Sequence, residues 1–373
     1  MTRPPARIGD PLDAVDTPAL IVDLDAFEYN LRKLPETLIG KPVRIRPHAK
    51  THKSPIIALK QIALGAVGVC CQKVSEAEAL VYGGVLDVLV SNQIVGAQKL
   101  ERLAALAKLA NIGVCVDDAQ NVRDIAAQAA RLNVKLDVYV EIDVGTFRCG
   151  VVPGEAAVAL AKEISVHKRL RFAGLHAYHG AAQHQRTDAA RRASIHEASQ
   201  HVLATRQALQ DAGLDCPIIT GAGTGTYLFE ASSQVYNEIQ PGSYIFMDAD
   251  YGRNCGDDGA PVSNFRQSLF VWATVMSHPT HDRAVVDAGL KALSVDSGMP
   301  LAADFRDVEY SRASDEHGVL LIKNSETKIS LGEKIRLTPG HCDPTVNMHD
   351  WYVGVRNGMV EQLWPISARG AMF

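Results

Sequence analysis

Residues 87–116 read DVLVSNQIVGAQKLERLAALAKLANIGVCV, and this stretch decides the fold class. Its two ends, 87–91 and 112–116, are short runs rich in Val, Leu and Ile, which predict buried strands. Between them, 97–110 repeats apolar residues at intervals of three and four positions, which predicts an amphipathic helix. A strand, a helix and a second strand in this order are typical of a parallel α/β sheet.

The same alternation continues on both sides of this stretch. Further helices are predicted over 76–82 and 121–132. The eight predicted strands are 43–46, 67–71, 87–91, 112–116, 136–142, 172–177, 217–220 and 238–245. Eight strands that alternate with helices predict a closed (β/α)8 barrel of the TIM type.

After about residue 255 the helical periodicity nearly vanishes. Strands are predicted at 269–276, 284–287, 319–323 and 351–355, and their spacing is typical of antiparallel pairing. We therefore expect a mostly antiparallel β domain after the barrel. The apolar run at 19–22, which precedes a predicted helix over 26–35, fits either domain by its periodicity alone.

Composition limits the function classes. The chain has 373 residues, of which 47% are hydrophobic and 21% charged, with a net charge of −4. This is the composition of an ordinary globular protein, and it lacks the basic patches of nucleic-acid-binding proteins. No stretch reaches the roughly 18 apolar residues that a membrane span needs, so we expect a small-molecule partner.

The first ten residues hold two prolines, two arginines and no apolar core, so we expect no secretory signal. The seven cysteines are an odd number, and several lie in apolar, strand-like runs. Reduced thiols in a cytoplasmic protein explain them best.

Catalytic groups of eight-stranded barrels lie just past the strand ends, and Lys50 occupies such a position. A lysine that forms a Schiff base needs a site that depresses its pKa, and partial burial beside cationic groups does so. His48 and His52 flank Lys50. From these residues alone, a surface lysine in a basic turn remains the alternative.

The segment 221–226, GAGTGT, follows the seventh predicted strand. Glycines let the backbone approach a phosphate, whose oxygens accept from backbone N–H groups and threonine hydroxyls. Loops after the seventh and eighth strands of such barrels often bind phosphate, and 242–244, GSY, lies at the eighth. A flexible turn is the alternative.

His341, Cys342 and Asp343 form a short motif. In an extended chain, His341 and Asp343 would face the same side, and an imidazole with a carboxylate suits Mn²⁺, Mg²⁺ or Zn²⁺. Asp343 in a turn before Pro344 would serve local hydrogen bonding instead. His349 and Asp350 follow closely, and we expect them to be structural.

A cluster of four polar residues, three of them histidines, follows the sixth predicted strand and offers groups that exchange protons near neutral pH. Its members are His176, Tyr178, His179 and His184. Satisfied polar residues at the rim of a barrel would have the same pattern.

Many motifs occur in order along nearly the whole chain. They are 46–53 (RPHAKTHK), 71–78 (CQKVSEAE), 140–143 (VEID), 148–150 (RCG), 223–225 (GTG), 242–244 (GSY), 248–252 (DADYG), 286–291 (VDAGLK), 315–318 (DEHG), 339–345 (PGHCDPT) and 367–370 (SARG). Together they resemble the D-threonine aldolase and D-3-hydroxyaspartate aldolase family, metal-activated pyridoxal-phosphate enzymes of the alanine-racemase-like fold.

The resemblance implies a barrel over 24–255 that binds pyridoxal 5'-phosphate, and a β-rich domain of 1–23 and 256–373 that carries the metal motif. It implies a homodimer. It places the cofactor on Lys50, its phenolic oxygen near Arg148 and its pyridine nitrogen near Tyr178. It implies that the phosphate is bound by Thr224, Gly225, Thr226 and Tyr244. The divalent ion, Mn²⁺ or Mg²⁺ with Co²⁺ or Zn²⁺ as alternatives, falls to His341 and Asp343.

The implied activity is that of a carbon–carbon lyase. It cleaves the Cα–Cβ bond of a D-3-hydroxy amino acid and releases glycine and an aldehyde: acetaldehyde from D-threonine, or glyoxylate from D-3-hydroxyaspartate. His184 is the expected base for the β-hydroxyl proton, and His52 is the second choice. A distal substrate carboxylate would need a cation, for which Arg253, Arg312 and Lys291 are the candidates.

Three other activities are weighed against this one. D-serine and D-3-hydroxyaspartate dehydratases of the same fold resemble the chain but carry Cys in place of Asp343, so Asp343 and the His184 segment favour the aldolase. A non-enzymatic pyridoxal-phosphate carrier would resemble the barrel alone, and the additional β domain argues against it. A racemase would need a second base, for which we find no candidate.

Overall fold

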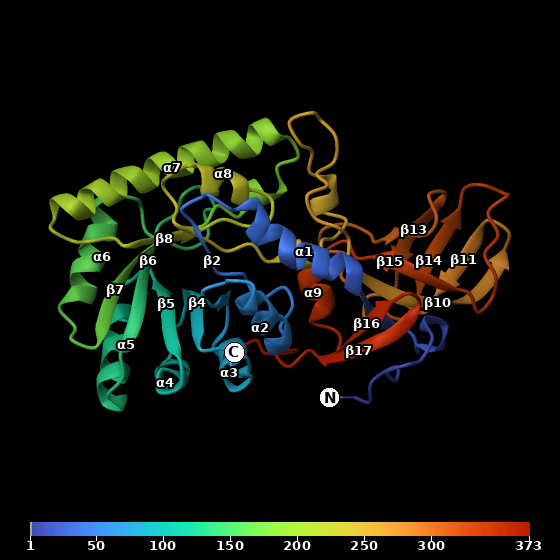
Figure 1. The fold of residues 1–373 in the computed structure, drawn as a ribbon, viewed down its shortest axis with the longest axis horizontal. Coiled ribbons are helices and arrows are strands. Elements are labelled where there is room, and N and C mark those ends of the chain that lie inside the picture. Colours follow the sequence, from blue (N-terminus) through green and yellow to red (C-terminus); the bar gives the residue numbers. More distant parts are fainter. Residues whose placement is uncertain (1) are drawn as a thin grey trace.

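The computed structural model describes residues 2–373 and contains one parallel and one mostly antiparallel sheet (Figure 1). The strands of the parallel sheet are β2 (Arg44–Ile45), β3 (Val69–Cys71), β4 (Asp87–Gln93), β5 (Asn111–Val116), β6 (Leu136–Glu141), β7 (Leu170–Ala177), β8 (Ile218–Gly221) and β9 (Glu238–Ile239). They are ordered β2-β9-β8-β7-β6-β5-β4-β3. A bridge between His48 and Cys70, with a hydrogen bond from Val67 N to Ile45 O at 2.9 Å, joins the two ends. The predicted eight-stranded barrel is confirmed.

Helices surround this barrel, as the apolar periodicity predicts. They are α1 (Leu24–Thr37), α2 (Pro55–Ala63), α3 (Val74–Tyr82), α4 (Ala97–Leu106), α5 (Ala119–Leu132), α6 (Glu155–Ser165), α7 (Asp188–Asp211) and α8 (Tyr227–Ser232). In α5, the Asp118 side chain caps the first turn by accepting from Asn121 N, and Asn133 ends the helix in a left-handed conformation. Val122, Ile125 and Ala129 form its buried stripe.

The prediction for the eighth strand, 238–245, is longer than the strand in the structure. Only Glu238–Ile239 pairs as a strand, and Ser243–Ile245 forms a short 3-10 turn, η3. Pro241 lies between them and has no N–H to donate to a neighbouring strand, which explains the early end. The backbone at Gly242 and Ser243 is thereby released to line a cavity.

The second sheet has nine strands: β1 (Ala19–Asp23), β10 (Leu269–Thr280), β11 (Arg283–Val286), β12 (Leu301–Ala302), β13 (Val308–Ala313), β14 (Gly318–Ile322), β15 (Lys334–Thr338), β16 (Trp351–Arg356) and β17 (Met359–Pro365). The four strands predicted after residue 255 fall on β10, β11, β14 and β16. Strand β1 lies between β10, antiparallel to it, and β16, parallel to it. The apolar run at 19–22 therefore pairs with strands from the far end of the chain.

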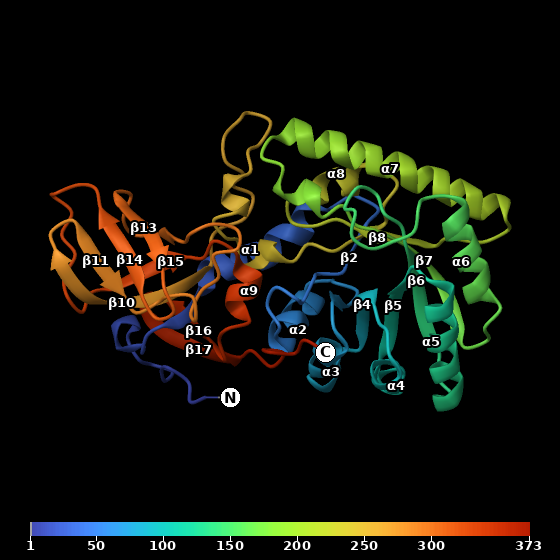
Figure 2. The ribbon, with the colours of Figure 1, turned by 180° about the vertical axis from the view of Figure 1, so that it is seen from behind.

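The two sheets share a hydrophobic core. Helices α1 and α9 (Cys342–Val346) lie between them (Figure 1). The Phe27 ring of α1 lies 6.3 Å from that of Phe246 and 5.3 Å from that of Trp364, a residue of β17. The chain end also returns to the barrel, since Phe373 N donates to Ser75 Oγ in α3 at 3.1 Å (Figure 2). The barrel and the unit that contains the nine-stranded sheet are therefore packed directly against each other.

Two further observations concern the residues that the structure describes. No helix within 2–373 is long and apolar enough to cross a membrane. All seven cysteines are free.

Candidate active site

A cavity of about 340 Å³ opens at the carboxyl ends of the barrel strands. Four of the predicted site residues line it: Lys50, Arg148, Tyr178 and Thr224. A larger cavity, of about 700 Å³, lies beside α7 and α8 and shares Thr224 and Tyr251 with the first. Its lining contains no lysine, so the smaller cavity is the candidate active site.

Lys50 lies on a turn that the barrel fixes from two sides. Arg46, just past β2, donates to Glu238 in β9 at 3.0 Å and to Asp87 in β4 at 2.5 Å. Beyond it, Ala49 N donates to Cys70 O in β3 at 2.7 Å. The lysine therefore stands at the barrel mouth on an anchored stretch of backbone.

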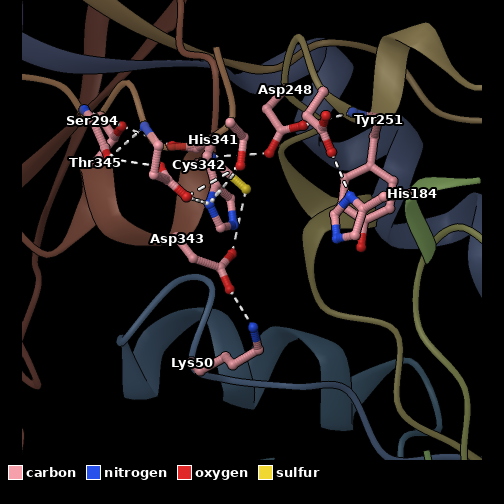
Figure 3. A network of polar contacts seen from close by, with 12 residues as sticks. Lys50, His184, Asp248, Tyr251, Ser294, His341, Cys342, Asp343 and Thr345 are labelled. Carbon is pink, nitrogen blue, oxygen red and sulfur yellow. Dashed lines mark hydrogen bonds and ion pairs between the residues drawn. The ribbon is translucent and has the colours of Figure 1, made fainter. Parts of the chain in front are cut away.

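The Lys50 side chain reaches across to helix α9, which lies between the two sheets. Its Nζ donates to Oδ2 of Asp343 at 2.7 Å (Figure 3). The Asp343 charge raises the pKa of Lys50 above its ordinary value, against the effect of burial. Burial raises the pKa of Asp343, but the Lys50 charge outweighs it and holds that pKa below its ordinary value. The expected depression of the Lys50 pKa by cationic neighbours is therefore wrong for this state, because Asp343 dominates.

The structure does not bring His52 to the cavity. Its side chain is fully buried, its Nδ1 accepts from Ser54 N at 3.1 Å, and burial lowers its pKa to about 4. Tyr352 donates to its backbone oxygen at 2.7 Å. These contacts belong to the packing between the two sheets, so His52 has no direct access to a ligand in the cavity.

Arg148 and Tyr178 lie together on one wall. The Arg148 guanidinium carbon is 5.7 Å from the centre of the Tyr178 ring. Asp143 Oδ1 accepts from the backbone N–H groups of Gly145 and Thr146 at 3.0 and 2.9 Å, which shapes the loop that carries Arg148. Burial raises the pKa of Tyr178, so its phenol stays protonated and able to donate.

The predicted phosphate residues divide into two groups. Thr224 lines the cavity, and its Oγ1 accepts from Tyr244 N at 3.0 Å. Gly225 N donates to Gln183 Oε1 at 3.0 Å, and the Thr226 hydroxyl donates to Glu230 at 2.8 Å. Gly223, Gly242 and Ser243 also line the cavity, together with polar side chains such as His48, Gln72 and His176.

Tyr244 and the missed residue Gln183 support this wall from behind. The Tyr244 hydroxyl accepts from Gln61 at 3.0 Å, away from the cavity. Gln183 is fully buried, and its Nε2 donates to Thr226 Oγ1 at 2.8 Å. A Cβ on Gly223 would lie 2.5 Å from Gln183 Oε1, and one on Gly242 would lie 2.6 Å from Thr51 Oγ1. Bare backbone is thus required on both sides of the cavity, which fits a phosphate cradle.

His341 and Asp343 lie at the start of α9, not on an extended strand as expected. His341 has extended dihedral angles and is the N-cap residue, whereas Cys342 and Asp343 are helical. His341 Nδ1 is 2.8 Å from Asp296 Oδ2. An imidazole that donates one N–H to a carboxylate is typical of metal-binding histidines, because this leaves the other nitrogen for the ion. The donor set therefore fits a divalent cation.

A different three-donor group lies inside the barrel. Within residues 2–373, potential ligand atoms of Cys115, Glu141 and His176 lie within 4.8 Å of one another. Burial and the Glu141 charge raise the pKa of the Cys115 thiol well above its ordinary value. Glu141 already accepts from Gln93 at 2.7 Å. A protonated thiol is a poor ligand, so we favour His341 and Asp343.

His184 ends the 3-10 turn η2 (Ala181–His184), which follows β7. Its Nδ1 lies 2.5 Å from Asp250 Oδ2, and its ring centre lies 5.6 Å from that of Tyr251. Figure 3 shows it opposite the His341–Asp343 motif. Asp250 was not singled out from the sequence, because 66 positions separate it from His184.

Among the candidate cations for a substrate carboxylate, Arg253 is closest to this region, since it donates to Asp250 and to Ser297 O. Lys291 pairs with Glu316 on the surface, and Arg312 lies on β13. His349 Nε2 donates to the backbone oxygen of Ala292 at 2.7 Å, and Asp350 accepts from Thr2. These last contacts are structural.

Comparisons with known proteins agree with this geometry. The family model described as alanine racemase, N-terminal domain, matches residues 22–250, and a serine dehydratase domain model matches 268–355. A 3-hydroxy-D-aspartate aldolase of Paracoccus denitrificans is 48% identical over 98% of this chain and 95% of its own. A D-threonine aldolase of Arthrobacter is 47% identical, with 98% and 96% covered. The crystal structure of a D-threonine aldolase from Filomicrobium marinum, 51% identical, covers 100% of both chains with a TM-score of 0.97.

Dehydratases are more distant. The D-threo-3-hydroxyaspartate dehydratase of Delftia is 28% identical over 90% of this chain and 93% of its own, and its structure gives a TM-score of 0.86. The predicted resemblance is confirmed by near full-length relatives of much higher identity. The chain therefore belongs to the D-threonine aldolase and 3-hydroxy-D-aspartate aldolase family, within the alanine-racemase-like fold.

Proposed function

We propose that the protein is a pyridoxal-phosphate- and divalent-metal-dependent aldolase that cleaves D-3-hydroxy amino acids to glycine and an aldehyde. The observation that carries this proposal is the contact between Lys50 Nζ and Asp343 Oδ2 at 2.7 Å. It joins the lysine that would hold the cofactor to the proposed metal motif at the start of α9. A site that holds a Schiff-base amine and a divalent ion side by side is suited to a substrate that carries both an amino and a hydroxyl group.

The barrel, 24–255, would hold the cofactor, and the unit formed by 1–23 and 256–373 would supply the metal motif. Lys50 would be the attachment point, Arg148 would lie near the phenolic oxygen and Tyr178 near the pyridine nitrogen. Thr224, Gly223, Gly242 and Ser243 would hold the phosphate, while Gly225, Thr226 and Tyr244 keep this wall in shape. When bound, the cofactor accepts the electron pair that remains on Cα after bond cleavage.

His341 and Asp343 would hold the ion, which lowers the pKa of an alcohol that it contacts. Mn²⁺ is our first choice, with Mg²⁺, Co²⁺ and Zn²⁺ as alternatives for this mixed donor set. His184 accepts the β-hydroxyl proton. The oxygen's electron pair becomes the second bond of the aldehyde carbonyl, the Cα–Cβ pair stays with Cα, and a proton from solvent completes glycine.

D-threonine and D-3-hydroxyaspartate differ in the group on the β-carbon, which is a methyl group in D-threonine and a carboxylate in D-3-hydroxyaspartate. We propose Arg253 as the residue that distinguishes them, because its guanidinium lies between Asp250 and Ser297, beside both His184 and the metal motif. A hydrogen bond to a charged group contributes about 1.5–3 kcal/mol, so an Arg253→Gln variant should lose roughly 10- to 100-fold in its preference for D-3-hydroxyaspartate over D-threonine.

Two wider proposals follow from the resemblance. We propose a cytoplasmic protein, which the seven free cysteines support because reduced thiols persist in that compartment. We also propose a homodimer. Size-exclusion chromatography with light scattering tests the dimer, and a monomer at micromolar concentration would refute it.

The test of function is an assay of the purified protein with pyridoxal phosphate and Mn²⁺. Glycine and aldehyde are followed from D-threonine and from D-3-hydroxyaspartate, with and without a chelator. We expect glycine and aldehyde in equal amounts, lost on chelation and restored by metal. Keto acid and ammonia without glycine would instead identify a dehydratase, which the serine dehydratase domain match keeps as the second candidate.

A further inference from the structure

Asp250 lies at the centre of a buried charge cluster beside the proposed base. Its side chain is only 6% exposed. Its Oδ1 accepts from Arg186 at 2.6 Å and from Arg253, and its Oδ2 lies 2.5 Å from Nδ1 of His184. The two guanidinium groups already exceed the single negative charge of Asp250. The contact with His184 is therefore not needed to balance the charge of Asp250. Instead, this contact fixes the orientation of the His184 ring.

The contact with Asp250 selects one form of the His184 ring. Burial raises the pKa of Asp250, but hydrogen bonds from Arg186, Arg253 and His184 outweigh it and lower that pKa below its ordinary value. An ionised carboxylate only accepts hydrogen bonds, so the proton of a neutral ring lies on Nδ1. Nε2 then carries a lone pair. Within residues 2–373 no hydrogen bond occupies this Nε2, and the His184 side chain is 47% exposed.

The same short segment also holds the metal motif. Asp248 Oδ2 accepts from Cys342 N at 2.9 Å, and Asp250 N donates to Gly340 O at 3.2 Å. Ala249 N donates to Pro339 O between them, at 3.0 Å. Residues 248–250 thus bind the backbone of the metal motif on one side and His184 on the other. Figure 3 shows the first of these contacts at Asp248 and places His184 across from it.

We propose that Asp250 is a positioning residue that holds His184 with an unprotonated Nε2 at a fixed place relative to the metal motif. This inference rests on the proposed function, in which the β-hydroxyl proton moves to Nε2 as the Cα–Cβ bond breaks. Asp250 touches neither substrate nor cofactor. It acts through His184, as the orienting carboxylate of a hydrolase triad acts through its histidine.

The experiment is a double-mutant cycle on the cofactor- and metal-loaded protein. It compares wild type, Asp250→Asn, His184→Gln and the double variant, with aldehyde release as the measured reaction. General-base catalysis contributes roughly 10²–10⁴-fold, so each single variant should lose at least about 100-fold in kcat with little change in KM. Because Asp250 acts through His184, the double variant should be no slower than His184→Gln alone.

A second readout separates positioning from general damage to the fold. Exchange of the glycine α-proton with deuterated solvent, followed by proton NMR, needs Lys50 and the cofactor but no β-hydroxyl base. All three variants should retain exchange within about threefold of wild type, a margin near the 0.6 kcal/mol thermal energy. Asp257→Asn is the matched control, because it removes one carboxylate from an exposed position nearby. It should keep both reactions.

Asp250→Glu guards against a folding failure of Asp250→Asn, since it keeps the charge between the two arginines but displaces the carboxylate. It should exchange normally and cleave at least about tenfold more slowly, a change of 1.4 kcal/mol. The inference would be overturned if the losses of the two single variants multiplied in the double variant. It would also be overturned if α-proton exchange fell as much as aldehyde release, or if Asp250→Glu cleaved the substrate at the wild-type rate. If the wild type itself releases no aldehyde, the proposed function fails first, and this is seen before any variant is compared.

Discussion

At the scale of single residues, the Asp343 carboxylate can pair with either of two cations: the Lys50 amine or a divalent ion. In this structure its Oδ2 binds Lys50, and its Oδ1 accepts from the Cys342 thiol at 3.4 Å. A protonated lysine cannot attack a carbonyl, so under the proposed function Lys50 would have to leave this ion pair before it could hold the cofactor. The residue pair that joins the two halves of the site is therefore also the contact that must change when the site is loaded.

Glu230 is a second residue whose charge depends on its surroundings. Its carboxyl group is buried beneath the glycine-rich loop and accepts from Thr226 at 2.8 Å. Burial raises its pKa from 4.5 to about 7. The folded protein thus keeps Glu230 protonated at pH values where the unfolded chain has already ionised it. Its stabilising contribution is complete below pH 4.5 and is lost as the pH rises through about 7.

Glu230→Gln should remove this pH dependence, because glutamine resembles the protonated acid at every pH. We expect the variant and wild type to have similar melting temperatures near pH 5. Near pH 8 the variant should be the more stable one, by up to about 3 kcal/mol in the free energy of unfolding. Denaturant titrations at both pH values measure the difference. An equal stability gap at the two pH values would contradict the assignment.

At the scale of secondary-structure elements, the position of helix α9 depends on a close approach of two backbone segments. Between β15 and α9, Gly340 passes next to residue 298, and a Cβ at Gly340 would lie 2.0 Å from Gly298 O. His341 and Asp343 follow immediately, and Asp250 N binds Gly340 O. The metal motif is therefore positioned by the chain that leads into α9, not by α9 alone.

Gly340→Ala should displace this motif, since neither backbone segment can yield without breaking hydrogen bonds. We expect the Mn²⁺ concentration for half-maximal activity to rise at least about tenfold, as for other losses of support around a metal ligand. A Mn²⁺ titration of aldehyde release measures it, with circular dichroism as the check on folding. An unchanged titration curve in a folded variant would show that the motif does not bind the metal.

The sequence predicted helices and strands correctly where buried residues form a continuous apolar run. The barrel strands and α4 are of this kind, and so are β10 and β16. Strands β13 and β15 were missed because VEYSRA and KIRLT alternate buried and charged residues over only five or six positions. The site residues Gln183 and Asp250 were missed for another reason. Their partners are distant in sequence, so no local pattern marks them.

The whole molecule consists of two sheets that share one buried cluster, in addition to a cluster that lies within the barrel alone. One buried cluster contains Phe27 and Phe246 from the barrel side together with Leu269 and Tyr352 from the other. Unfolding either unit alone would expose the shared surface, at a cost of about 25 cal/mol per Å² of apolar area. The active site has the same property, since Lys50 and Asp343 come from different units.

The protein should therefore unfold in one cooperative transition despite its size. All three tryptophans, Trp272, Trp351 and Trp364, lie in the nine-stranded sheet, whereas nearly all helical residues surround the barrel. Tryptophan fluorescence and circular dichroism at 222 nm thus report on different units. We expect their urea transitions to coincide. Two separated midpoints would show that the units are independently stable.

Strand β1 has a consequence for how the chain is made on the ribosome. Its partners β10 and β16 begin at residues 269 and 351, so most of the protein is synthesised between β1 and the strands that flank it. At about 5–20 residues per second, the first partner emerges only after an interval on the order of tens of seconds. During that time an apolar strand has both edges open, and the barrel itself stays incomplete until β9, its last strand, has been made. Nascent chains that pause within the barrel would therefore present this strand to other proteins, and chaperone binding to such chains is expected to centre on residues 19–23.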